Sequence, residues 1–142
     1  MIYALCNKAD MSAIAQMEAK YIECPWNENV LNESFEQSEY VFIKAEENDV
    51  LVGYGSVQIV FEEGNINNIA VDEKFRNRGI ASGILSNIIE ICKQRGVTTL
   101  FLEVNEHNTG AIALYEKFNF EKIAVRKNYY KSGNAIIMSL KI

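Results

Sequence analysis

The sequence predicts a single α/β domain, of the α+β kind, with a mixed and mostly antiparallel twisted sheet of about seven strands flanked by about four helices. Three observations support this fold class. The chain has 142 residues, 49% of them apolar, and no linker or low-complexity tract divides it, so we expect residues 1–142 to form one domain. Three strand patterns with tight turns follow one another between residues 40 and 71, as in an antiparallel meander. After residue 71, helix and strand patterns alternate.

The N-terminal part contains the first two predicted helices and four of the strands. Asp10 and Asn27 are suitable N-cap residues, and apolar side chains recur at helical spacing after each of them. Pro25 and Trp26 interrupt the pattern and leave an aromatic loop between the two helices. The expected elements are a strand at 1–6, a helix at 11–22, a short helix that includes 30–35, and strands at 40–45, 51–61 and 65–71.

The C-terminal part alternates helices with strands. Ile80 to Cys92 carry apolar side chains on one helical face, and Gly96 ends that helix as a C′ glycine. Asn108 caps the last helix, whose pattern extends to Phe118. The expected elements are helices at 80–92 and 108–118, a strand at 98–104, and a final hairpin of strands 123–130 and 135–140.

Charge and cysteine content restrict the possible partners. Fourteen basic and nineteen acidic residues give a net charge of -5, which disfavours nucleic-acid binding and suits a basic peptide. Cys6, Cys24 and Cys92 are odd in number and widely spaced, so we expect neither a disulfide framework nor a zinc site. No signal peptide and no apolar run of ~18 residues is present. We therefore expect a cytoplasmic protein with no metal, no membrane partner and no direct nucleic-acid partner.

Several enzyme classes lack their motifs in this chain. His107 is the only histidine, it lies in the polar turn 105–109, and no G-x-S-x-G elbow accompanies it. A Ser-His-Asp hydrolase is therefore not expected, and we assign His107 no role. Neither a P-loop nor a G-x-G-x-x-G fingerprint is present, which disfavours ATP and NAD.

One stretch suggests a ligand, and it begins where the third meander strand ends. That strand ends at Val71, and Arg76, Arg78 and Gly79 open the next helix. Unpaired N–H groups and the positive end of the helix dipole meet at such a start and favour a phosphate, and Gly79 leaves room for a pyrophosphate. Taken alone, this motif is better explained as an ordinary helix start with solvated arginines than as a phosphate-binding site.

Residues 76–81, RNRGIA, match the acetyl-CoA motif Q/R-x-x-G-x-G/A of the GNAT acetyltransferases, and the segments 102–104 and 108–120 resemble that family in order and spacing. More narrowly, five segments of this chain resemble the bacterial ribosomal-protein-alanine N-acetyltransferases: 25–26, 68–71, 111–116, 126–130 and 135–138. The resemblance therefore covers nearly the whole chain. Two positions depart from the pattern. Asn119 replaces a glycine that is common in the family, and asparagine tolerates the left-handed geometry that this position needs after a helix. Lys131 replaces a proline that often follows the paired tyrosines. These departures concern the peptide groove rather than the cofactor site.

The resemblance implies the GNAT fold, acetyl-CoA as co-substrate, and two catalytic residues. It implies that Glu103 is the base that accepts the amine proton, directly or through water, and that Tyr115 is the acid that protonates the departing thiolate of coenzyme A. From the residues alone there are two interpretations of Glu103. A carboxylate beside Phe101 in a cleft would have a raised proton affinity and could serve as a base, but a solvated acid at a strand end is the better interpretation. A packing residue on an amphipathic helix is the corresponding alternative for Tyr115.

The resemblance also implies a set of cofactor contacts. Ile69 to Val71 would pair with the pantetheine amides like an added strand, with the Val71 N–H polarising the thioester carbonyl. The alternatives are an edge strand that faces solvent and, for Asn108, a simple N-cap. The implied cofactor-binding residues are Ile69, Ala70, Val71, Arg76, Asn77, Arg78, Gly79, Ile80, Ala81, Ser82 and Asn108.

Four residues are implied to lie on either side of the substrate amine, namely Pro25, Trp26, Tyr129 and Tyr130, with core packing as the alternative for Trp26. The narrower resemblance implies transfer of acetyl to the N-terminal alanine of a small-subunit ribosomal protein, whose basic N-terminal peptide suits an acidic enzyme. A GNAT enzyme for another protein N-terminus, a lysine or a small amine remains an alternative. A non-catalytic acetyl-CoA-binding module is a further one.

Overall fold

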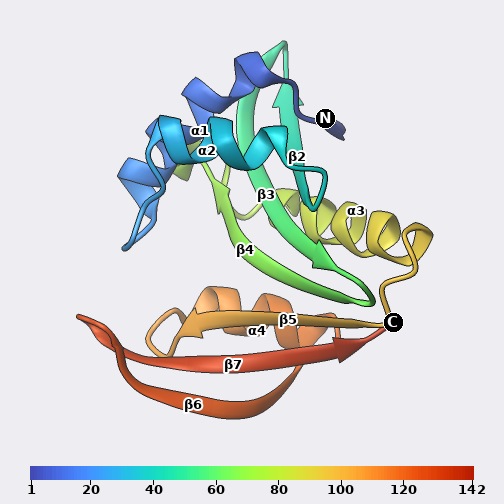
Figure 1. Ribbon diagram of the computed structural model, residues 1–142. Helices are drawn as coiled ribbons and strands as arrows, with labels where there is room; N and C mark the ends of the chain where they lie inside the picture. The colour runs from blue at the N-terminus through green and yellow to red at the C-terminus, as the bar shows by residue number, and fades with distance from the viewer.

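The chain forms one seven-stranded sheet with the order β1-β2-β3-β4-β5-β7-β6 in a computed structural model that describes residues 1–142 (Figure 1). Helices flank the sheet, which confirms the predicted fold class. The strands are β1 Ile2–Leu5, β2 Tyr40–Glu47, β3 Val50–Val60, β4 Glu63–Val71, β5 Thr99–Asn105, β6 Glu121–Tyr130 and β7 Gly133–Lys141. The helices are α1 Met11–Tyr21, α2 Glu28–Glu36, α3 Ile80–Gln94 and α4 Thr109–Lys117, with short 3-10 turns at Lys8–Asp10 and Glu73–Phe75.

All neighbouring strands are antiparallel except β4 and β5. These two pair in parallel only where Glu63–Ile66 face Thr99–Leu102. Beyond Ile66 the two strands separate, and Figure 1 shows β4 rising away from β5 toward the α1–α2 end of the molecule. The sheet therefore opens along its middle, at the C-terminal ends of these two strands.

A β-bulge in β4 lies where the strands separate. The register places Ile66 and Ile69 opposite residues 57 and 55 of β3, so Asn67 and Asn68 share the single partner Ser56. An extra residue of this kind bends a strand and redirects its side chains. Here it accompanies the divergence of β4 from β5 and sets the direction of two asparagine side chains.

Helices cover both faces of the β1–β4 part of the sheet (Figure 1). Alternate residues of β2 divide between two hydrophobic clusters, because successive side chains of a strand point to opposite faces. Phe42 joins Ile14 of α1 and Leu31 of α2, whereas Val41 and Ile43 join the cluster that contains α3 and the inward side of α4. The α1–α2 pair and the α3–α4 pair thus lie on opposite faces of the sheet.

The helix starts follow the predicted caps with one exception. The side chains of Asn27 and Asn108 each accept a backbone N–H of their helix, at 2.9 Å and 3.2 Å. Asp10 precedes α1 as predicted, but its side chain does not cap that helix. Its carboxylate instead accepts the N–H of Asn7 at 2.8 Å and pairs with the buried Lys44 at 2.9 Å, and these partners replace the expected cap. None of the helices has the length and apolar character needed to cross a membrane.

Candidate active site

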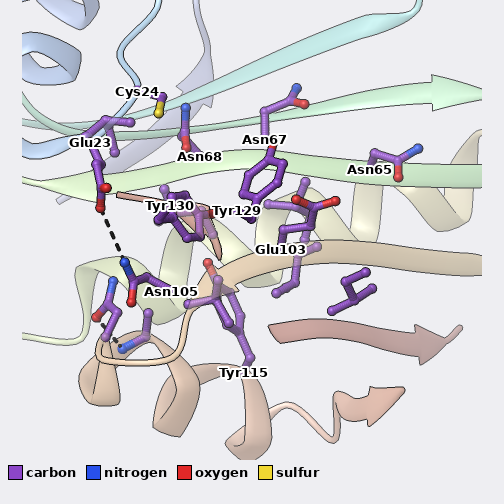
Figure 2. A pocket seen from close by; sticks show the side chains of 18 of the residues that line it. Glu23, Cys24, Asn65, Asn67, Asn68, Glu103, Asn105, Tyr115, Tyr129 and Tyr130 are labelled. Carbon is purple, nitrogen blue, oxygen red and sulfur yellow. Dashed lines mark hydrogen bonds between the residues drawn. The ribbon is translucent and has the colours of Figure 1, made fainter. Parts of the chain in front are cut away.

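The divergence of β4 and β5 opens a cleft of about 830 Å³ (Figure 2). Its walls come from the α1–α2 loop, β4, β5 with the loop after it, α4, and the β6–β7 hairpin. The structure brings both predicted catalytic residues and three of the four predicted substrate residues to this one cavity. The predicted site residues that line it are Trp26, Ile69, Glu103, Asn108, Tyr115, Tyr129 and Tyr130.

A second groove of about 560 Å³ lies between the end of β4 and the start of α3. It contains all the predicted cofactor-binding residues except Arg78. The groove and the cleft adjoin, because six residues line both cavities: Tyr21, Ile22, Ile69, Asn108, Ala111 and Tyr115. A molecule held in the groove can therefore present one end to the cleft at these residues, which we call the junction.

The loop before α3 presents unpaired backbone N–H groups to the groove. Asn77 and Gly79 have φ values of +62° and +78°, a left-handed geometry that asparagine and glycine tolerate. The first backbone hydrogen bond of α3 runs from the Gly83 N–H to the Gly79 carbonyl at 3.0 Å, so the N–H groups of residues 80–82 have no partner within the helix. No atom lies within 4 Å of the position that a Gly79 Cβ would take. An open site with N–H groups at a helix N-terminus fits the pyrophosphate of acetyl-CoA.

The two arginines of this loop are bound by the protein itself. The Arg76 Nε donates to the Val71 carbonyl at 3.1 Å, and its guanidinium lies 4.7 Å from the centre of the Tyr21 ring. The Arg78 guanidinium donates to the Glu47 carboxylate at 2.8 Å and does not line the groove. The resemblance implied a cofactor contact for Arg78, and in this structure its guanidinium is paired with Glu47 at the end of β2.

Two backbone N–H groups near the end of β4 have no partner in β3. The N–H of Asp72 donates to the Val52 carbonyl of β3 at 2.8 Å. In an antiparallel ladder the N–H groups alternate between the partner strand and the other side, so those of Ile69 and Val71 point away from β3. Ile69 lines both cavities, whereas Val71 lines only the groove. Of these two donors, only the Ile69 N–H belongs to a residue of the junction, whereas the resemblance implied the Val71 N–H for the thioester carbonyl.

Tyr115 of α4 lies at the junction and is 7% exposed. Its ring packs edge to face on Phe120, with centroids 5.7 Å apart, so the packing interpretation of this tyrosine is correct as far as it goes. Burial, and then the nearby Tyr130, raises the pKa of the Tyr115 phenol to about 12. The hydroxyl therefore keeps its proton at neutral pH and is available as a donor.

Glu103 projects from β5 into the cleft (Figure 2). The strand alternates as predicted: Leu102 and Val104 are buried, and the Glu103 side chain is 29% exposed. Its Oε1 lies 3.2 Å from a guanidinium nitrogen of Arg126 on β6, and that guanidinium lies over the Tyr129 ring at 5.0 Å. Arg126 was not predicted as a site residue, although it lies just before the tyrosine pair that was.

A bulge in the β6–β7 hairpin shapes the aromatic side of the cleft. Residues 127–129 of β6 oppose the single residue Asn134 of β7. Asn128 has a φ of +55° and donates its N–H to the Asn134 side chain at 2.8 Å. The strand bends at this point, and Tyr129 and Tyr130 both line the cleft with ring centroids 5.0 Å apart.

The α1–α2 loop supplies the opposite aromatic wall. Trp26 lines the cleft and packs edge to face on Tyr40, with centroids 6.0 Å apart. Trp26 therefore both packs against the core and faces the cleft, so each of the two interpretations describes part of its surroundings. Pro25 is exposed and does not line the cleft, so its side chain is not where the sequence placed it.

Three polar residues at the edge of the cleft are joined by hydrogen bonds: Glu23 of the α1–α2 loop, Asn105 at the end of β5 and Ser132 of the β6–β7 turn. We call them the clamp. The Ser132 hydroxyl donates to Glu23 at 2.6 Å. The Asn105 amide donates to Glu23 at 3.3 Å and to the Ser132 Oγ at 2.6 Å, and Figure 2 shows the first of these bonds. The hydrogen bond from Ser132 is the main reason that the pKa of Glu23 is lowered. No sequence motif marks the clamp, because its members lie far apart in the chain.

Comparison with known proteins agrees with this geometry. The Acetyltransferase (GNAT) family matches residues 8–120, a range that holds the whole groove, Glu103 and Tyr115. The chain belongs to the GNAT acetyltransferase family. It is therefore an acetyl-CoA-dependent N-acetyltransferase, and the groove that fits a pyrophosphate agrees with that co-substrate.

Relatives of this GNAT enzyme match it over nearly its whole length. The ribosomal protein bS18-alanine N-acetyltransferase of Salmonella typhimurium is 34% identical over 98% of this chain and 96% of that protein. The crystal structure of the ribosomal-protein-S18-alanine N-acetyltransferase from Escherichia coli has a TM-score of 0.91 at 31% identity, covering 99% of this chain and 93% of that one. Arabidopsis thaliana NAA60 in complex with acetyl-CoA, with a TM-score of 0.87 at 16% identity over 99% and 98% of the two chains, shares the fold.

Proposed function

We propose that this enzyme transfers the acetyl group of acetyl-CoA to the α-amine of an N-terminal alanine, and that its substrate is a small-subunit ribosomal protein in the cytoplasm. The observation that carries the proposal is the junction, where a groove with free backbone donors meets an aromatic-walled cleft that contains Glu103 and Tyr115. Relatives named for ribosomal protein bS18-alanine acetylation match nearly the whole chain, which supports this substrate. The net charge of -5 suits a basic peptide.

Backbone groups hold the co-substrate, which supplies an acetyl thioester when it is bound. The N–H groups of residues 80–82 bind the pyrophosphate at the start of α3. The Val71 N–H pairs with an amide of the pantetheine arm, and Asn108 contacts the same arm while its side chain caps α4. The Ile69 N–H, which faces the junction, donates to the thioester carbonyl oxygen and stabilises the negative charge that develops there.

Glu103 serves as the base. An α-amine has an ordinary pKa of ~8, so most of it is protonated at neutral pH and one proton must leave before the nitrogen can attack. The Glu103 carboxylate accepts that proton, directly or through a water molecule. Its ion pair with Arg126 holds the carboxylate on the cleft side of β5.

Tyr115 serves as the acid. As the new C–N bond forms and the C–S bond breaks, the sulfur of coenzyme A gains negative charge. Tyr115 lines both cavities, so its hydroxyl can reach a sulfur held at the junction. Because its pKa is about 12, the phenol is protonated before each turnover, and it donates its proton to the sulfur.

The aromatic walls select a small first residue. Trp26, Tyr129 and Tyr130 narrow the cleft beside the catalytic pair, and a bulky side chain at residue one would have to displace them. Discrimination by one methylene group is worth ~1 to 3 kcal/mol. Leucine has three more carbons than alanine, so alanine is preferred to leucine by roughly tenfold or more, while the small side chain of serine is tolerated.

The experiment that tests the proposal compares initial rates on peptides that differ only in residue one, beside a peptide with a blocked N-terminus and an internal lysine. Alanine is expected to react faster than leucine, and the blocked peptide is expected to react poorly. If the blocked lysine peptide is the best substrate, the enzyme is a lysine acetyltransferase and the proposal is wrong.

A further inference from the structure

Glu18 of α1 is a buried carboxylate with no cation beside it. It is 1% exposed, and no salt bridge involves it. Its hydrogen bonds come from the side-chain amide of Asn68, whose Nδ2 lies 3.0 Å from one carboxylate oxygen and 3.3 Å from the other. Burial raises the pKa of Glu18, and the nearby Tyr54 and Asn68 oppose that rise. Burial of a carboxylate without a counter-charge lowers stability, and carboxylates in such surroundings are common at functional sites.

The carboxylate determines which way the Asn68 amide faces. A carboxylate accepts hydrogen bonds, so the NH₂ group of Asn68 must point to Glu18 and the Oδ1 must point the other way. Tyr54 Oη and Asn67 Nδ2 are the buried side-chain polar atoms without a partner, so the unpaired Asn68 Oδ1 is not buried. Asn68 lines the cleft, and Figure 2 shows its nitrogen directed away from Tyr130 and its oxygen on the Tyr130 side.

The position of Asn68 places this free acceptor close to the reaction. Asn68 belongs to the β4 bulge and directly precedes Ile69, whose N–H faces the junction. Glu103 lies across the cleft on β5 (Figure 2). An amine that enters between the two strands therefore meets Asn68 Oδ1 on one side and the Glu103 carboxylate on the other.

We infer that Asn68 is an additional substrate-binding residue, whose Oδ1 accepts an N–H of the substrate α-amine, and that Glu18 is the positioning residue that holds this amide in the required orientation. The inference rests on the proposed function. The ammonium group gives one proton to Glu103, and the neutral amine then has a lone pair and two N–H groups. One N–H is held by Asn68 while the lone pair forms the C–N bond. As the C–S bond breaks, Tyr115 gives its proton to the sulfur, and the other N–H proton, which the amide product does not keep, returns through solvent to the Tyr115 phenolate.

The test measures steady-state kinetics of Asn68→Ala with an N-terminal alanine peptide. We expect kcat/KM for the peptide to fall ~10-fold or more, because a hydrogen bond to a charged or reacting group is lost, while KM for acetyl-CoA is unchanged. Gln58→Ala is the matched control: Gln58 of β3 also donates its amide to a carboxylate, Glu39 at 3.2 Å, but lies outside the cleft. It is expected to leave the peptide kinetics unchanged.

Glu18 is tested through its effect on Asn68. Glu18→Met removes the acceptor, releases the amide to rotate, and is expected to lower kcat/KM for the peptide a few-fold, whereas Glu18→Gln keeps an acceptor oxygen and restores most of it. In the Asn68→Ala background, Glu18→Met is expected to have no further effect on the peptide. A thermal unfolding scan of each variant confirms that it is folded.

A peptide that starts with N-methylalanine isolates the proposed hydrogen bond, because its neutral amine has a single N–H. The rate penalty for N-methylation is expected to be larger in the wild-type enzyme than in Asn68→Ala. Wild-type peptide kinetics in a folded Asn68→Ala, or a loss confined to acetyl-CoA, would overturn the inference. Failure of the proposed function itself would appear in the wild-type enzyme, which would then acetylate none of the N-terminal peptides.

Discussion

The cofactor groove and the substrate cleft meet at Tyr115 but are built in different ways. Most of the groove comes from residues 69–82, with further walls from the end of α1 and from residues 108–115. Its proposed contacts are mostly backbone N–H groups of residues 69–82, presented by a loop in which Asn77 and Gly79 have positive φ values. The cleft is lined by side chains from four distant segments, and the clamp joins three of them. Changes in the groove should therefore alter acetyl-CoA binding for every peptide, and changes in the cleft should alter the choice of peptide.

The largest effect is expected where the two regions meet. Tyr115→Phe keeps the ring packed on Phe120 and removes only the hydroxyl, and Glu103→Gln keeps the shape of the side chain and removes the base. Each change should lower kcat by ~10² to 10⁴, the usual contribution of acid-base catalysis. Coenzyme A affinity, measured by calorimetry, should stay near the wild-type value. Near wild-type rates for both variants would show that Tyr115 is only a packing residue and that Glu103 is only a solvated acid.

A change in the groove is expected to act on the co-substrate alone. Gly79→Val places a side chain in the open space before α3 and should weaken acetyl-CoA binding ~10-fold or more, with Kd measured by calorimetry. Gly96→Val is the matched control, because Gly96 has a φ of +81° and also has open space around its Cβ position, but it lies at the other end of α3. Both variants carry a similar backbone strain. Equal loss of affinity in the two would mean that strain, and not the groove, explains the effect.

A smaller effect is expected from opening the clamp. Glu23→Ala removes the acceptor that connects the α1–α2 loop with Ser132, so the aromatic walls should move apart more easily. An exposed hydrogen bond is worth ~1 kcal/mol, and the ratio of alanine to leucine peptide rates should fall by a few-fold. Glu33→Ala removes an exposed carboxylate of α2 outside the cleft and should leave the ratio unchanged. A ratio that is the same in both variants would show that the clamp does not restrict the cleft.

The smallest effect concerns stability and its dependence on pH. Burial raises the pKa of Glu18 in the folded protein, so the folded state binds this proton more tightly than the unfolded state. Stability from this group is present at low pH and is lost as the pH rises from the unfolded value of 4.5 through the higher folded value. Glu18→Gln removes this titration, so its thermal midpoint relative to wild type should be higher at pH 7.5 than at pH 4. A difference that is constant with pH would contradict the raised pKa.

Local signals in the sequence were sufficient for most of the fold and for the groove. Asn27 and Asn108 cap their helices through a neighbouring backbone N–H, and Gly96 and Asn119 adopt the left-handed geometry expected after a helix, with φ values of +81° and +72°. Most of the predicted cofactor contacts lie within residues 69–82, so a short motif was enough to point to this part of the groove. Arg78 is the exception, because its partner Glu47 belongs to a distant strand.

The cleft depends on contacts between distant segments, and the sequence predicted less of it. The β4 bulge follows from the pairing register with β3, which determines where Asn68 points and cannot be inferred from the pattern of β4 alone. The same holds for Asp10, whose carboxylate pairs with Lys44 instead of capping α1. Glu18 was not among the predicted site residues, because its burial depends on the packing of α1 on β4, where it meets Asn68.

Mass spectrometry of ribosomal proteins from cells with and without this enzyme tests whether its substrate is the N-terminal alanine of a small-subunit ribosomal protein. In cells without the enzyme, we expect one small-subunit protein to lose a single acetyl group from its N-terminal alanine, and we expect the Tyr115→Phe variant not to restore that group. Unchanged N-terminal acetylation of every ribosomal protein, with a loss of acetyl groups from lysines or from a small amine instead, would contradict this proposal.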